Sequence, residues 1–269
     1  MWDSNVWLAF GLSLFAGLST GIGGVIALLT RKVNTRLLSL ALGFSAGVMI
    51  YVSFMDILPE GRKILMAARG DVTGSWLAIL GFFAGMLAFA LIDHLIPEDK
   101  NPHEPCLPRD FECEERENAS ALRRSGLMAA LAIAIHNFPE GLATFSAALQ
   151  NPQSGIAIAA AVAIHNIPEG IAVAVPLTYA TGSKVKGFLH ALLSGLTEPL
   201  GALVGYLVLA PFLTDTLMGL LFAFVAGIMV FISLDELLPT ARAYAEEHLA
   251  IYGVVLGMAV MAVSLVLFM

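Results

Sequence analysis

The stretch from Ser154 to Thr178 reads SGIAIAAAVAIHNIPEGIAVAVPLT, and it decides the fold class of this chain. Only one side chain in it, Glu169, carries a formal charge, and the stretch exceeds the roughly 20 apolar residues that a helix needs to cross a bilayer. The whole chain of 269 residues has the same character, because 58% of its residues are hydrophobic and 13% are charged. Soluble domains carry roughly a quarter charged residues. The composition therefore predicts an integral membrane protein and excludes both a soluble globular domain and a disordered chain.

Seven other apolar stretches of similar length surround this one. The eight predicted spans are residues 5–29, 37–59, 75–97, 125–149, 154–178, 186–210, 216–239 and 250–269. Their length and their lack of strict alternation indicate helices, since membrane β-strands are alternating segments of ~10 residues. We therefore expect an all-α integral membrane protein, with eight transmembrane helices in a single transmembrane domain over residues 1–269.

Lysine and arginine residues gather in alternate loops of this arrangement. Of the 14 basic residues, 11 lie in the loops after the first, third, fifth and seventh spans. Because basic loops stay in the cytoplasm, we expect a multi-pass protein of the cytoplasmic (inner) membrane with both termini outside. The net charge of −7 argues against a nucleic-acid partner, which requires a basic surface.

The longest of these loops, residues 98–121, is predicted to be an acidic cytoplasmic segment. It contains His103, Cys106 and Cys113 among its carboxylates, and cytoplasmic thiols are normally reduced. One hypothesis makes it a weak metal-capture or sensing loop. A solvated tether is an equally good hypothesis, because the two cysteines lack the tight spacing of a structural zinc site.

The second and seventh predicted spans repeat one pattern at a constant offset of 180 residues. Gly47, Met49, Ser53, Asp56 and Pro59 recur as Gly227, Met229, Ser233, Glu236 and Pro239. These two spans cross the membrane in opposite directions, as do the first and sixth and the fourth and fifth. The pattern predicts inverted repeats in a 3+2+3 order, which is typical of transporters that work by alternating access.

The fourth and fifth predicted spans carry a duplicated polar motif. It reads His136-Asn137-Phe138-Pro139-Glu140-Gly141 in one span and His165-Asn166-Ile167-Pro168-Glu169-Gly170 in the other. A histidine and a glutamate four residues apart share a helix face, and the short connection makes the two helices antiparallel neighbours. We therefore expect two imidazoles and two carboxylates to converge near mid-membrane, where an isolated charge costs at least a few kcal/mol.

Proline accompanies each of these glutamates. Pro139 and Pro168 cannot donate to the carbonyls four residues earlier, so each helix should kink there. In the sixth span Glu198 is followed by Pro199, and His190, Ser194 and Glu198 form a polar stripe at four-residue spacing. The sequence thus predicts a third carboxylate at the same depth.

Imidazole and carboxylate groups together suit a divalent first-row metal ion such as Zn²⁺, Fe²⁺ or Mn²⁺. Asn137 and Asn166 could add neutral oxygen ligands or hold a carboxylate in place, and Glu198 leaves room for one metal or two. The competing interpretation is a structural hydrogen-bonded pair in each helix. Met49 is either a soft accessory ligand or a packing residue.

Two further acids lie near helix ends. Asp56 and Glu236 each precede a Leu-Pro pair, at Pro59 and Pro239. We expect both carboxylates to be solvated at the membrane interface and not to bind metal.

These motifs resemble those of the ZIP (Zrt/Irt-like) divalent-metal transporters, especially bacterial members, over nearly the whole chain. The resemblance implies metal uptake into the cytoplasm through a two-metal centre on the fourth, fifth and sixth helices. It implies one metal held by His136, Glu140, His165 and Glu169 with Met49, and a second held by Asn137, Asn166 and Glu198 with the shared carboxylates. The acidic loop departs from the histidine-rich loop of many relatives.

The leading hypothesis is therefore a secondary transporter, and not an enzyme, that moves Zn²⁺ and also Fe²⁺, Mn²⁺ and Co²⁺. The metal ions are its substrates, no cofactor is expected, and its partners are the ions, the lipid bilayer and a second copy in a homodimer. One alternative is a metal-dependent intramembrane hydrolase, because an open coordination position activates water. The other is a membrane protein that senses metal without transporting it.

Overall fold

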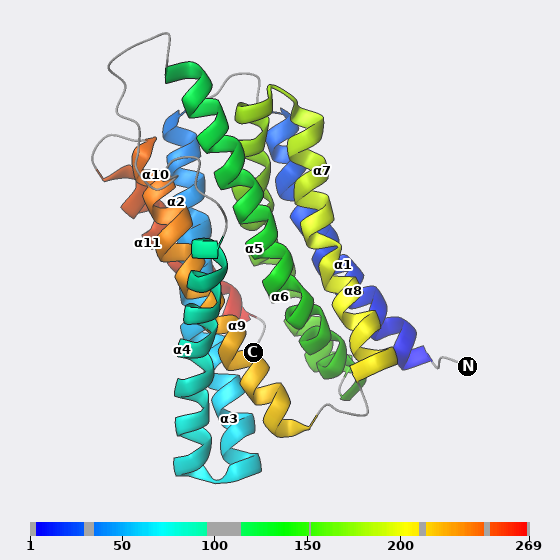
Figure 1. Ribbon diagram of the computed structural model, residues 1–269. Helices are drawn as coiled ribbons and strands as arrows, with labels where there is room; N and C mark the ends of the chain where they lie inside the picture. The colour runs from blue at the N-terminus through cyan, green and yellow to red at the C-terminus, as the bar shows by residue number, and fades with distance from the viewer. Residues whose placement is uncertain are drawn as a thin grey trace.

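The computed structural model describes residues 4–29, 35–95, 114–150, 152–209, 214–244 and 248–267. These residues are almost entirely helical and contain no strand (Figure 1). The elements are α1 (Ser4–Leu29), α2 (Thr35–Val52), η1 (Ser53–Ile57), α3 (Leu58–Arg69), α4 (Asp71–Leu95), α5 (Glu114–Gln150), α6 (Pro152–Thr181), α7 (Lys184–Gly195), α8 (Thr197–Val204), η2 (Gly205–Leu209), α9 (Asp215–Ile232), η4 (Ser233–Leu237), α10 (Leu238–Ala243) and α11 (Leu249–Leu267). The predicted all-helical fold is confirmed.

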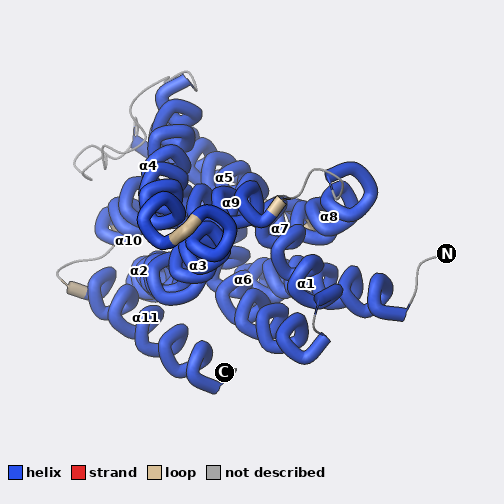
Figure 2. The backbone as a smooth tube through the Cα atoms, turned by 90° about the horizontal axis from the view of Figure 1, so that it is seen from below, coloured by secondary structure: helices blue, strands red, loops and turns tan. Residues whose placement is uncertain are grey.

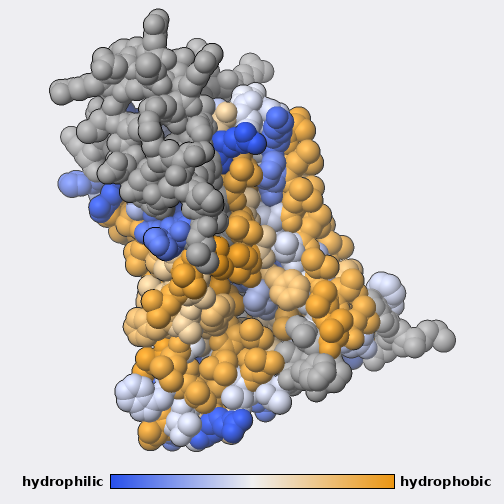
Figure 3. Space-filling view, viewed as in Figure 1, coloured by the Kyte–Doolittle hydropathy of each residue, from blue (hydrophilic) through white to orange (hydrophobic). Residues whose placement is uncertain are grey.

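Seven helical segments of the described chain are long and apolar enough to cross a membrane. The remaining predicted span lies in α5, which has the polar residues His136, Asn137 and Glu140 in its middle and packs against α6, α8 and α9. In Figure 3 apolar side chains form a broad band, and hydrophilic ones gather above and below it. The chain is therefore a multi-pass membrane protein.

Two predicted boundaries differ from the structure. The second span does not end at residue 59, because α2, η1 and α3 form one continuous helical run to Arg69. Helix α5 begins at Glu114, so the last part of the predicted loop 98–121 is helical. The loop's His103, Cys106 and Cys113 lie outside the described residues.

The helices pack in two groups. Helices α1, α5, α6, α7 and α8 contact one another closely, and α2, α3, α4, α9, α10 and α11 form the other group. Figure 2 shows the groups side by side, joined mainly where α2 meets α6 and α5 meets α9. Each group therefore contains both members of the predicted repeat pairs, the first with the sixth span and the second with the seventh.

Glycine contacts bring the helices of each group close together. In the first group, a Cβ at Gly23 of α1 would collide with the Ile167 carbonyl of α6, and one at Gly170 of α6 would collide with Thr20 of α1. In the second group, a Cβ at Gly227 of α9 would collide with the Phe82 carbonyl of α4. Small residues allow such close backbone approach, which supplies packing energy between helices that are surrounded by lipid.

The same kind of contact recurs between α2 and α11. A Cβ at Gly47 of α2 would collide with the Val254 carbonyl, and one at Gly257 of α11 with the Phe44 carbonyl. Gly47 and Gly227 are equivalent in the predicted repeat. Helix α2 thus packs on α11 as α9 packs on α4.

The repeat also shows in two π-helical turns. In η1 and in η4, a serine hydroxyl donates a 2.7 Å hydrogen bond to a methionine carbonyl four residues earlier, Ser53 to Met49 and Ser233 to Met229. The proline six residues after each serine, Pro59 in the first case, has no N–H to donate, which favours the wider turn. Turns of this type are frequent at functional sites, and these two carry acids, Asp56 in η1 and Asp235 and Glu236 in η4.

Candidate metal centre

The two copies of the duplicated motif meet in the middle of α5 and α6. His136 Nε2 lies 2.9 Å from Glu169 Oε1, and His165 Nε2 lies 2.9 Å from Glu140 Oε1. All four side chains are buried. The predicted convergence is therefore present, and the pairing is reciprocal, because each imidazole faces the carboxylate of the other helix.

The two asparagines use their amide groups as donors to backbone carbonyls. Asn137 Nδ2 donates to the Ser194 carbonyl of α7 at 3.3 Å, and Asn166 Nδ2 donates to the Ala16 carbonyl of α1 at 3.0 Å. Since a carbonyl can only accept, these bonds fix which end of each amide is the oxygen. Both Oδ1 atoms are left without a partner among the described residues.

Glu198 is held beside Asn166 by a break between α7 and α8. Asn166 Nδ2 also donates to Glu198 Oε2 at 2.8 Å, and Glu198 is fully buried. On the other side, α8 packs closely against α5 at Gly141, where a Cβ would collide with the Glu198 carbonyl. Gly141, the last residue of the α5 motif, therefore allows the helices to pack closely. This packing brings the Glu198 carboxylate near those of Glu140 and Glu169.

Several buried polar atoms of this centre remain unsatisfied. Among the described residues, no hydrogen-bond partner exists for the following side-chain oxygens: Asn137 Oδ1, Glu140 Oε2, Asn166 Oδ1, Glu169 Oε2 and Glu198 Oε1. The Nδ1 atoms of both histidines are also unpaired there, and His165 Nε2, although 2.9 Å from Glu140 Oε1, does not form a hydrogen bond with it. Buried polar atoms without partners are rare in proteins. Three buried carboxylates are costly unless a positive charge compensates them, so the cluster favours a bound cation.

In this conformation the histidines and glutamates contact one another in pairs and do not form a metal coordination sphere. In the part of the chain that the structure describes, no three of the His, Cys, Asp and Glu side chains surround a common point closely enough to hold a metal ion. Met49 is fully buried in a hydrophobic cluster with Met229 and Ala172. The metal-binding roles assigned to these residues thus stay predictions.

The predicted polar stripe on the sixth span is interrupted. Ser194 and Glu198 are buried, but His190 is partly exposed, and its ring nitrogen Nδ1 lies 2.8 Å from the Lys186 carbonyl of its own helix. The helix break at Leu196 comes between His190 and the centre.

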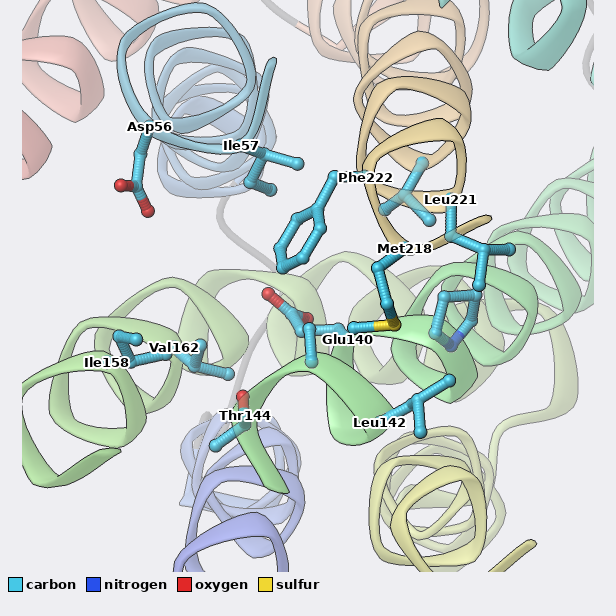
Figure 4. Close-up of a pocket in the computed structure, with 13 residues that line it drawn as sticks. Asp56, Ile57, Glu140, Leu142, Thr144, Ile158, Val162, Met218, Leu221 and Phe222 are labelled. Atoms are coloured by element: carbon cyan, nitrogen blue, oxygen red, sulfur yellow. The ribbon is translucent and has the colours of Figure 1, made fainter. Parts of the chain in front are cut away.

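Sequence reasoning placed one of the two acids near helix ends wrongly. Glu236 is buried and not solvated at the interface. Asp56 is exposed, as expected, but it lines a pocket together with Glu140, Thr144 and residues of α6 and α9 (Figure 4). The common spacing of Asp56 and Glu236 in the two repeats was the signal that could have marked both as residues that face neighbouring helices.

Comparison with known proteins agrees with this geometry. The family model described as ZIP zinc transporter matches residues 93–265. This chain belongs to the ZIP zinc transporter family. The resemblance seen in the sequence is confirmed, and membership in this family of transporters favours a transporter over the intramembrane hydrolase.

Curated members of the ZIP family align with this chain from end to end. The zinc transporter ZupT of Lysinibacillus sphaericus is 60% identical over 266 residues, which cover 98% of this chain and 99% of the relative. The zinc transporter ZupT of Nitratidesulfovibrio vulgaris is 56% identical over 278 residues, which cover 99% of each chain. The same-named protein of Streptococcus mutans is 56% identical over 266 residues, again 99% of each chain.

Proposed function

We propose that this protein imports divalent transition-metal ions, Zn²⁺ above all and also Fe²⁺, Mn²⁺ and Co²⁺, across the cytoplasmic membrane. The observation that carries the proposal is the group of unpaired buried oxygens around the two His–Glu pairs. Relatives named zinc transporters over their full length support it. Its orientation, with both termini outside, follows from the basic loops.

In this proposal the metal replaces the His–Glu pairs. One ion is held by His136, Glu140, His165 and Glu169, with Met49 as an accessory ligand. A second ion uses the free oxygens of Asn137, Asn166 and Glu198 with the shared carboxylates. Metal binding would replace the His–Glu contacts and would give partners to the unpaired oxygens of Asn137, Asn166 and Glu198.

Release on the other side requires the centre to change its exposure. The ligands other than Met49 lie on α5, α6 and α8, all in one helix group, while α2 and α9 of the other group close them off. Because the two groups touch at few places, a shift of one group past the other is the simplest form of alternating access. A homodimer in the membrane is part of the same proposal.

Flux through purified protein in liposomes tests the function. Vesicles loaded with a zinc-sensitive dye should show saturable uptake of external Zn²⁺, and Fe²⁺, Mn²⁺ and Co²⁺ should compete. Empty vesicles set the background. Zinc binding at equilibrium without uptake would instead identify the metal-sensing alternative.

A further inference from the structure

A pocket borders the buried His/Glu/Asn centre on the side of the α5–α6 connection. It is lined by Asp56 of η1, by Glu140 and Thr144 of α5, and by apolar residues of α6 and α9 (Figure 4). The α5 residues after Glu140 and the α6 residues before His165 both lead to the short α5–α6 connection. The charge pattern predicts that this connection lies outside, so the pocket is on the outer side of the centre.

The polar atoms in this pocket are few and they face one another. In Figure 4 the carboxylates of Asp56 and Glu140 and the hydroxyl of Thr144 point toward the same space. Phe222, Met218 and the other lining side chains are apolar, so these are the polar side-chain atoms that the lining offers to a ligand.

Thr144 is fully buried, and its hydroxyl has no hydrogen-bond partner among the described residues. A helical hydroxyl usually donates to the carbonyl four residues earlier, as Ser53, Ser233 and Ser264 do here at 2.7–2.9 Å. Thr144 lies one turn beyond Glu140, on the same helix face. Its free hydroxyl therefore needs a water molecule or an ion as a partner.

Glu140 connects this pocket with the centre. Its Oε1 lies 2.9 Å from His165 Nε2, and its Oε2 is buried and without a partner among the described residues. The two oxygens of the Glu140 carboxylate thus connect the pocket with the imidazole of His165. An ion bound by Oε2 would reach the imidazoles without crossing an apolar surface. The pocket has a volume of about 50 Å³, enough for a cation with a few water molecules.

We propose that Asp56, Thr144 and Glu140 form an outer binding site that holds a partly hydrated divalent cation before it reaches the His/Glu/Asn centre. The site offers oxygen atoms only, which suits an ion that has kept part of its water shell. The inner centre, with its imidazoles, then completes the dehydration. This proposal rests on the inward transport proposed above.

Uptake kinetics in liposomes test the outer site. The chain should be compared with the variants Asp56→Asn, Asp56→Glu and Thr144→Val over a range of external Zn²⁺ concentrations. We expect Asp56→Asn to raise KM about fivefold or more with kcat little changed, because a binding interaction is lost without a change in the later steps. Asp56→Glu should restore KM, and Thr144→Val should raise it less.

Glu60→Gln is the matched control. Glu60 lies one turn beyond Asp56, is exposed, and pairs with Lys63 at 3.2 Å outside the pocket. The control removes the same charge nearby, so it reports the general surface potential. An unchanged KM in Asp56→Asn, or equal shifts in Asp56→Asn and Glu60→Gln, would overturn the outer site.

A binding measurement separates this proposal from the proposed function. Zinc bound at equilibrium is measured by dialysis on detergent-solubilised His165→Ala, with and without Asp56→Asn, after both have shown the elution profile of the parent. We expect a weak zinc site in His165→Ala that Asp56→Asn removes. Equal zinc binding in the two proteins contradicts the outer site even if the parent transports. A parent that binds zinc but does not move it contradicts the function alone.

Discussion

The cross-pairing of His136 with Glu169 and of His165 with Glu140 links two helices through four buried side chains. Neither partner of such a pair has an alternative contact in lipid, so the two helices hold one another in register. The same atoms are the ones that a transition metal prefers. At the scale of single residues, the pairs explain how the polar motif is tolerated inside the membrane.

Removing one member of this set should abolish transport. We expect His165→Ala and Glu140→Gln each to lower zinc uptake in liposomes by roughly tenfold or more, because loss of groups at metal sites costs at least that much. His190→Ala is the matched control, since its ring is bonded to the Lys186 carbonyl away from the centre. Uptake that survives in His165→Ala but fails in His190→Ala would refute the assignment.

Acid should weaken uptake. Imidazoles and carboxylates bind metal only after losing their protons, so protons compete with Zn²⁺ at the centre. We expect the apparent affinity for zinc to fall between about pH 7.5 and pH 5.5, across the usual range of histidine titration. The measurement uses vesicles with equal pH inside and outside, which removes any proton gradient. A flat profile would speak against histidine ligands.

At the scale of elements, the glycines of the motifs decide how closely the helices approach. Gly141 admits the backbone of Glu198 to α5, and Gly170 and Gly23 bring α1 against α6. The approach of α1 allows its Ala16 carbonyl to accept from Asn166. The arrangement of the buried His, Glu and Asn side chains therefore depends on close backbone contacts at these glycines.

A pair of substitutions on α1 tests this dependence. Gly23→Val should destabilise the protein by about 1–3 kcal/mol, because the side chain has no room against the Ile167 and Gly170 backbone. Gly11→Val on the same helix should be neutral, since nothing lies within 4 Å of a Cβ there. Thermal denaturation in detergent measures both. Equal melting temperatures would show that this helix contact is not tightly packed.

At the scale of the whole molecule, the chain forms two helix groups, and the predicted repeat partners always share a group. The predicted metal ligands on α5, α6 and α8 belong to one group, while the pocket of Asp56 and Glu140 is bordered by both. A relative shift of the groups would therefore change access to the centre without rebuilding it.

The orientation of this whole arrangement can be tested with single cysteines. Asp71 lies beside the α3–α4 turn and Lys186 near the α6–α7 turn, at opposite ends of the bundle, and both are exposed. In a background with Cys106 and Cys113 replaced by serine, a membrane-impermeant maleimide should label Asp71→Cys in intact cells. It should label Lys186→Cys only after the membrane is permeabilised. The reverse pattern would invert the predicted topology.

The membrane class, most span positions and the meeting of the His-Asn-x-Pro-Glu-Gly motifs could be predicted from sequence. Each depends on local properties: hydropathy summed over about 20 residues, and a helical repeat that puts His136 and Glu140 on one face. The short link between α5 and α6 made them neighbours. The duplicated motif, with the Glu198-Pro199 motif and the eight spans, thus pointed to the family, and it predicted which side chains meet.

The tertiary structure decided which atoms face one another. Glycine contacts elsewhere in the helices set their rotation and spacing. This arrangement paired His136 with Glu169 and left the side-chain oxygens of the two asparagines without partners. It also kept His190 away from the buried centre. They also brought Asp56 to the pocket of Glu140, which its place near a helix end did not suggest. Hydropathy and spacing describe one helix at a time, whereas a binding site is a property of how several helices approach.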